Sequence, residues 1–78
     1  MKSTIIVCEY GWILVGQVSK ATKDTITLEN ASIVRRWSTG RGVGALAQEK
    51  YKSDYTLDEI GGVEIRTSKV LFQIPCEW

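Results

Sequence analysis

The segment from residue 35 to residue 44 holds the side chains in this sequence that are best suited to binding chemistry. It reads RRWSTGRGVG, so three arginines surround one tryptophan, two hydroxyl groups and three glycines. Guanidinium groups pair with a phosphate through two parallel hydrogen bonds, and glycines expose backbone N–H groups that also bind anions. A tryptophan can stack on a nucleobase. The candidate nucleic-acid contacts are Arg35, Arg36, Trp37 and Arg41. The alternative is a solvated loop in which Trp37 fills the interior or contacts another subunit.

The residues that usually carry catalysis are sparse. The sequence has no histidine, which is the commonest general base and the commonest metal ligand. Asp54, Asp58 and Glu59 could hold a metal or act as acid and base, but without a second cluster a solvated loop is favoured. Cys8 and Cys76 show no CxxC spacing, and we expect buried free thiols, with a disulfide between them as the alternative. The sequence therefore favours binding over catalysis, with no enzymatic activity, cofactor or metal.

Length and charge limit the class of protein further. A chain of 78 residues and 8.7 kDa predicts one domain over residues 1–78. A formal net charge of +1 excludes a generally basic nucleic-acid-binding arm but allows a local basic patch. No apolar run is long enough to cross a bilayer or to serve as a signal peptide. We therefore expect a cytoplasmic protein without a membrane partner.

The elements that would hold these side chains read as β-strands almost throughout. Residues 4–9 and 25–29 are short strand patterns, and residues 33–37 resume an extended pattern after an interruption at residues 30–32. Residues 12–19 are apolar on both faces, which predicts a strand covered on both sides. Gly16 within it predicts a sharp bend or a close backbone approach.

The second half of the chain is predicted to contain a long loop and a hairpin. Residues 45–50 are good helix formers and allow one or two helical turns, and residues 51–62 read as a polar loop. Residues 63–66 and 69–74 read as a tight two-stranded hairpin. The predicted fold class is all-β. It is a small, strongly bent, five-stranded antiparallel barrel of the Sm-like or SH3-like kind, whose long loop between strands 3 and 4 can include one short helix.

Two segments resemble the motifs of the Sm/LSm family of small five-stranded barrels. Gly11 and Gly16 match the glycine spacing of the family's first motif, and Ile65-Arg66 matches the start of its Ile-Arg-Gly turn. The resemblance implies that Arg66 faces a central pore and contacts RNA. The alternative for Arg66 is a surface charge that pairs with Glu64 or Asp24.

The sequence also departs from the Sm/LSm pattern. Thr67 replaces the glycine of the second motif, and Asp24-Thr25 stands where the family has an aspartate and the asparagine that holds a base. Arg-Arg-Trp before a Thr-Gly-Arg-Gly-like loop is similar to a set of short phage and bacterial proteins. That second resemblance implies a phage or mobile-element origin.

Oligomerisation completes the expected function. A small barrel leaves unpaired edge strands, and Sm-like barrels pair them between neighbours into a closed ring. A ring repeats each basic site, so we expect a cyclic homo-oligomer that binds single-stranded nucleic acid, RNA rather than DNA. Trp78 at the chain end either packs back on its own barrel or inserts into a neighbour, and a large apolar residue there favours contact with another subunit. The alternatives are a phage-encoded binder of a small nucleotide or of a host protein, of the defence-inhibitor type, and a purely structural oligomeric adaptor.

Overall fold

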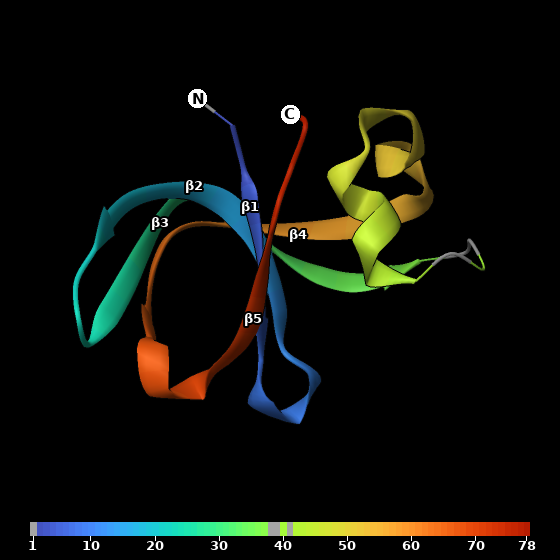
Figure 1. The fold of residues 1–78 in the computed structure, drawn as a ribbon. Coiled ribbons are helices and arrows are strands. Elements are labelled where there is room, and N and C mark those ends of the chain that lie inside the picture. Colours follow the sequence, from blue (N-terminus) through green and yellow to red (C-terminus); the bar gives the residue numbers. More distant parts are fainter. Residues whose placement is uncertain (1, 38–39, 41) are drawn as a thin grey trace.

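The computed structural model describes residues 2–37, 40 and 42–78, and they form one strongly bent antiparallel sheet of five strands (Figure 1). The sheet order is β4-β3-β2-β1-β5. The strands are β1 Thr4–Cys8, β2 Ile13–Ala21, β3 Thr25–Trp37, β4 Tyr55–Arg66 and β5 Val70–Pro75. The helical pieces are short 3-10 turns: η1 Glu9–Gly11, η2 Val43–Ala47, η3 Glu49–Asp54 and η4 Thr67–Lys69. Among the described residues, no helix is long and apolar enough to cross a membrane.

The prediction of a strongly bent five-stranded antiparallel sheet is confirmed, but the sheet is not closed. Within the described ranges, β4 pairs with β3 and β5 pairs with β1, so β4 and β5 are the two edges. The predicted hairpin between residues 63–66 and 69–74 is therefore wrong. Although η4 joins the two strands directly, β5 aligns Phe72 with Val7 and Ile74 with Ile5 of β1. The buried, apolar β1 strand thus gains a partner on each side.

Two further elements differ from the sequence prediction. The expected interruption at residues 30–32 is a bulge within a continuous β3, where Asn30 adopts a left-handed backbone (φ 50°) and the pairing with β4 shifts around Ala31. Residues 55–62, predicted as part of a polar loop, form the first part of β4. The two charged residues of this segment, Asp58 and Glu59, are exposed. Together with two glycines they leave few apolar residues, so the segment lacks the pattern that usually marks a strand.

Hydrophobic clusters lie on both faces of the central strands, as the apolar pattern of residues 12–19 predicts. Successive side chains of β1 point to opposite faces of the sheet, so Ile5 and Val7 belong to the first cluster and Ile6 and Cys8 to the second. β2 does the same with Val15 and Leu14. The first cluster is covered by η2, through Ala45, Leu46 and Ala47. Burial on both faces keeps the central strands in place although the sheet is open.

The C-terminus packs back onto its own chain, which corrects the expectation that Trp78 contacts another subunit. The backbone N–H of Ser3 donates to the Trp78 carbonyl at 2.6 Å, so the two termini lie side by side (Figure 1). The Trp78 indole N–H donates to the Leu46 carbonyl at 2.8 Å, and the Lys52 ammonium lies 4.0 Å from the centre of its ring. Trp78 therefore ties the end of the chain to η2 and η3.

β2 and β3 approach closely at Gly16, as its place inside a strand predicts. A Cβ atom at Gly16 would lie 2.9 Å from the Ala31 Cα and 3.1 Å from the Glu29 carbonyl oxygen. The β2–β3 pairing shifts between Val15 and Gln17, on either side of this glycine. The Ala31 Cβ atom would also lie at 3.0 Å, and since it is fixed to the backbone, no side-chain rotation can make room for a larger residue.

We expect Gly16→Ala to destabilise the protein by about 1–3 kcal/mol, because β2 and β3 must separate to admit the methyl group. Urea unfolding followed by circular dichroism measures this change. Gly44→Ala is the matched control, since a Cβ atom there meets nothing within 4 Å. Equal stability of the two variants would contradict the close contact.

Candidate nucleic-acid interface

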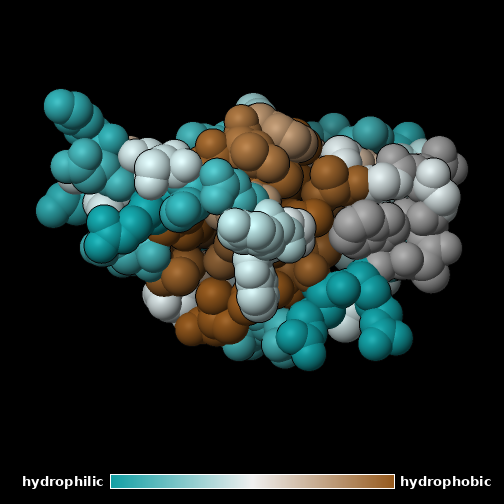
Figure 2. Space-filling model, turned by 90° about the horizontal axis from the view of Figure 1, so that it is seen from below, coloured by the Kyte–Doolittle hydropathy of each residue, from teal (hydrophilic) through white to brown (hydrophobic). Residues whose placement is uncertain are grey.

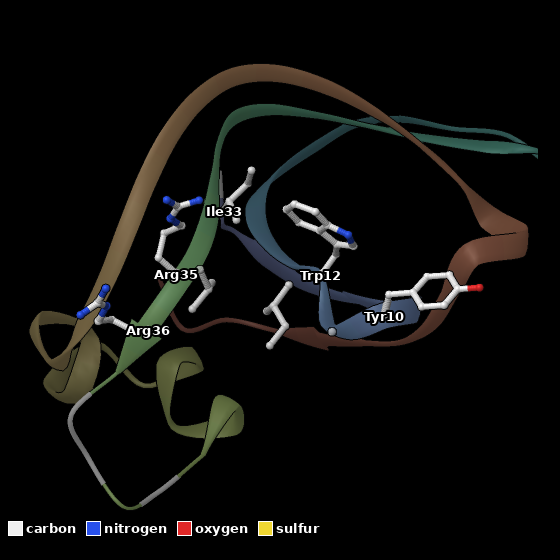
Figure 3. Close-up of a pocket in the computed structure, with 8 residues that line it drawn as sticks. Tyr10, Trp12, Ile33, Arg35 and Arg36 are labelled. Atoms are coloured by element: carbon white, nitrogen blue, oxygen red, sulfur yellow. The ribbon is translucent and has the colours of Figure 1, made fainter.

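A hollow of ≈ 420 Å³ brings two of the predicted arginines next to two aromatic residues. It lies between the β1–β2 turn and the second half of β3, and it is lined by Tyr10, Gly11, Trp12, Ile13, Ile33, Val34, Arg35 and Arg36. Figure 3 shows the aromatic side chains rising from the β1–β2 side and the arginines from β3. The hollow thus combines flat stacking surfaces with positive charge, which is the combination that single-stranded nucleic acid requires.

The aromatic side is built by a tight turn. Tyr10 and Gly11 both have a left-handed backbone, with φ values of 62° and 77°, and the Cys8 N–H donates to the Trp12 carbonyl at 2.8 Å. This turn leaves Tyr10 93% exposed and Trp12 55% exposed. The pairing of β2 with β3 ends at Leu14 and Ile33, and beyond this pair Trp12 and Arg35 both line the hollow.

The charged side is held by β4 as well as by β3. The Arg35 Nε atom lies 3.9 Å from the Asp58 Oδ2 atom, and Asp58 is the β4 partner of Ile33. Both side chains are more than half exposed, so the pair contributes little to stability. Figure 3 shows the Arg35 side chain on the opposite side of Ile33 from Trp12. Arg36 is exposed and forms no ion pair within the described part of the chain.

Arg66 lies at the opposite end of the same ladder. It pairs with Thr25 at the start of β3, whereas Trp37 pairs with Tyr55 at the end of β3. Roughly 35 Å of extended chain separates Thr25 from Arg36. The structure therefore does not bring Arg66 together with Arg35 and Arg36.

Arg66 lies in a second region, beside the β2–β3 turn that carries Lys23 and Asp24. The Thr67 N–H donates to the Asp24 carbonyl, and the Thr67 hydroxyl donates to the Lys23 carbonyl, both at 2.9 Å. These bonds hold η4 against the β2–β3 turn, and so bring Lys23 near Arg66. Arg66 is exposed, and among the described residues it forms no ion pair with Glu64 or Asp24.

The other predicted site residues cannot be placed in either region. Arg41 lies outside the described residues, and so does the side chain of Trp37, whose backbone ends β3 opposite Tyr55. Sequence reasoning missed Tyr10 and Trp12. The sequence pattern assigned Trp12 to a strand that is covered on both sides. In the structure Trp12 precedes β2 and is 55% exposed, whereas Leu14 within β2 is buried. The signal that could have found both is the aromatic pair flanking Gly11 in a turn.

The two cysteines are free and buried, as predicted. Burial raises the pKa of the Cys8 thiol. Burial also raises the pKa of the Cys76 thiol, and a hydrogen bond with the Ile5 backbone and the nearby Lys52 charge only partly oppose this shift. A thiol that stays protonated is a poor nucleophile, so neither cysteine is suited to covalent chemistry.

Comparison of the chain with protein-family models, with curated proteins and with solved structures found no match.

The raised thiol pKa values predict a stability loss at alkaline pH. The unfolded chain releases its thiol protons near an ordinary pKa of about 8.5, while the folded chain retains them. The free energy of unfolding should therefore fall as the pH rises above that value, and the fall should be smaller in the Cys8→Ala/Cys76→Ala variant. Urea titrations of both proteins between pH 7 and pH 10 measure the difference. Identical pH profiles of the two proteins would contradict the burial of the thiols.

Proposed function

We propose that this protein is a non-catalytic, Sm-like binder of single-stranded nucleic acid that works as a cyclic homo-oligomer and prefers RNA to DNA. The observation that carries the proposal is the hollow that the exposed aromatic residues Tyr10 and Trp12 line together with Arg35 and Arg36. The preference for RNA rests on the resemblance to the Sm/LSm family.

The chemistry of the hollow supports a single strand rather than a duplex. An aromatic ring stacks only on a base whose face is free, and the bases of a duplex cover one another. Trp12 and Tyr10 belong to neither buried cluster, and they leave large aromatic surfaces in water. Stacking a base on them would remove this surface from water, while Arg35 and Arg36 would meet the adjoining phosphates.

The edges of the sheet support assembly into a ring. β4 and β5 each pair on one side only, and β5 exposes Leu71 to 63% and Phe72 to 51%. Figure 2 shows a broad apolar surface on one face of the molecule, with hydrophilic residues beside it. Pairing β4 of one copy with β5 of the next would satisfy both edges and cover such residues. The same ring would bring the Arg66 and Lys23 side chains of all copies into one circle. Positive charge would then be concentrated locally although the net charge per chain is only +1.

The first test is the affinity for fluorescent ten-nucleotide RNA, single-stranded DNA and duplex DNA, measured by anisotropy at low salt. We expect binding to both single strands, tighter for RNA, and weak binding to the duplex. Trp12→Ala should weaken RNA binding about 5- to 150-fold, because one stacked base contributes about 1–3 kcal/mol. Lys2→Ala, at an exposed cation remote from the hollow in sequence, is the control and should retain affinity. If the unaltered protein binds no oligonucleotide, the proposal fails.

The second test distinguishes the contribution of Arg66 to RNA binding from that of the hollow. Arg66→Ala should weaken RNA binding and reduce the slope of log affinity against log salt, because fewer counterions are released. Trp12→Ala should lower the affinity while leaving that slope nearly unchanged, since stacking releases no counterions. A salt slope that Arg66→Ala leaves unchanged would remove Arg66 from the interface.

The third test concerns assembly. The native mass, measured by light scattering during size exclusion, should be a multiple of 8.7 kDa. A charged substitution on the β5 edge, Phe72→Lys, should lower that mass and weaken RNA binding through the loss of repeated sites. Phe72 is half exposed in one chain, so the variant should still fold. A monomer at every concentration would contradict the ring.

A further inference from the structure

A second hollow, of ≈ 250 Å³, lies beside the point where the two ends of the chain meet. It is lined by residues of β2, β3, β4 and η3 and by both ends of the chain, and none of these residues lines the first hollow. It is smaller than the clefts of about 300–1,000 Å³ that hold drug-sized molecules, so a ligand that fills it must be small. The lining residues that matter for binding are Ser3, Val15, Ser32, Lys52, Glu59 and Trp78.

Two buried serine hydroxyls open into the second hollow. Ser3 is 9% exposed and Ser32 is 8% exposed, and both line the hollow. Within the described ranges, neither hydroxyl forms a hydrogen bond, although no fully enclosed side-chain oxygen or nitrogen there lacks a partner. Both hydroxyls must therefore reach the open space of the hollow. Because a hydroxyl shielded from bulk water without a partner costs stability, such a pair favours a bound molecule that supplies the partners.

One row of the sheet contributes three residues to the second hollow. Ser32 of β3 is paired with Val15 of β2 on one side and with Glu59 of β4 on the other. Paired residues of antiparallel strands place their side chains on the same face, and all three residues line the hollow. The Glu59 carboxylate and the Ser32 hydroxyl thus share this face with the apolar side chain of Val15, which is 2% exposed.

The positive charge of the second hollow comes from η3. The Lys52 ammonium lies 4.0 Å from the centre of the Trp78 ring, and Lys52 is partly buried. Trp78 is itself fixed, because its indole N–H donates to the Leu46 carbonyl and its own carbonyl accepts from the Ser3 N–H. Trp78 therefore links Lys52 to the end of the chain that carries the Ser3 hydroxyl.

The two charges of the second hollow do not neutralise each other. Lys52 and Glu59 both line it, and in the part of the chain that the structure describes neither residue forms an ion pair. A ligand that carries both charges would complement them, since an ammonium donates to a carboxylate and a carboxylate accepts from an ammonium. Each serine hydroxyl can either donate or accept, so it can assist at either end of such a ligand.

We propose that the second hollow binds a free α-amino acid with a short apolar side chain. Its ammonium group donates to the Glu59 carboxylate and to the Ser32 hydroxyl, and its carboxylate accepts from the Lys52 ammonium and from the Ser3 hydroxyl. Its side chain packs on the apolar part of the lining. The site shares no residue with the first hollow, so this inference goes beyond the proposed function and does not depend on it.

The first experiment compares L-valine with two derivatives that each lack one charge. Amide NMR titration should show saturable shifts at Ser3, Ser32 and Glu59 with L-valine. N-acetyl-L-valine lacks the ammonium and L-valinamide lacks the carboxylate, so each should bind at least about tenfold more weakly. Titrations with L-alanine, L-valine and L-leucine that all fail to saturate would overturn the proposal. Equal affinity for L-valine and both derivatives would also overturn it, because neither charge would then be recognised.

Charge-removing variants assign the two ends of the ligand. Glu59→Gln should weaken L-valine binding at least about tenfold and change the affinity for N-acetyl-L-valine little, because that compound has no ammonium. Glu64→Gln is the matched control, since Glu64 is exposed on the same strand and does not line the second hollow. Lys52→Gln should weaken the binding of L-valine but not of L-valinamide, and Lys50→Gln in the same η3 turn is its control. Loss of affinity in the controls alone would overturn the assignment.

The variant Ser32→Ala distinguishes a binding hydroxyl from a structural one. It should weaken L-valine binding about fivefold, because one hydrogen bond to the ligand is lost. Without L-valine, the stability of the variant in urea should equal or exceed that of the unaltered protein, because a shielded hydroxyl without a partner is removed. A variant that is less stable but binds L-valine unchanged would overturn the role of Ser32. A failure of RNA binding would leave all these expectations in place, since the two sites share no residue.

Discussion

The contact of Gly16 with the backbone of β3 is the constraint on which the rest of the molecule depends. Because no side chain separates Gly16 from Ala31, β2 and β3 remain paired while the sheet bends sharply around them. The bend turns one apolar face of β1 and β2 inward and leaves the other to be covered by η2. A chain with few core residues thereby buries two clusters instead of one.

The same bend determines where charge and aromatic surface appear. β3 runs through the whole sheet, so one of its ends lies beside the β1–β2 turn and the other beside η4. Arg35 and Arg36 emerge at the first end, and Arg66 is held near the second by the bonds of Thr67. The basic residues therefore form two separate regions, and a strand of nucleic acid would have to cross the molecule to reach both.

The two ends of the chain are joined by hydrogen bonds although the sheet is open. The pairing of β5 with β1, and the bonds of Trp78 to Ser3 and Leu46, join the two ends of the chain. This arrangement uses one side of β5 and leaves its other side, together with that of β4, unpaired. One side of β5 thus holds the chain together, and the proposed assembly would use its other side.

The sequence by itself determined the all-β class, the two-sided burial of β2, the special role of Gly16, the buried thiols and the candidates Arg35 and Arg36. Each of these follows from local pattern, since alternation, glycine placement and residue type act over a few neighbours. Only the tertiary structure decided that residues 55–62 form a strand, because their apolar content is low and pairing with β3 holds them. It also placed β5 against β1, laid Trp78 on its own chain and made Trp12 and Arg35 line one hollow. Those outcomes depend on register between distant segments, which no local pattern contains.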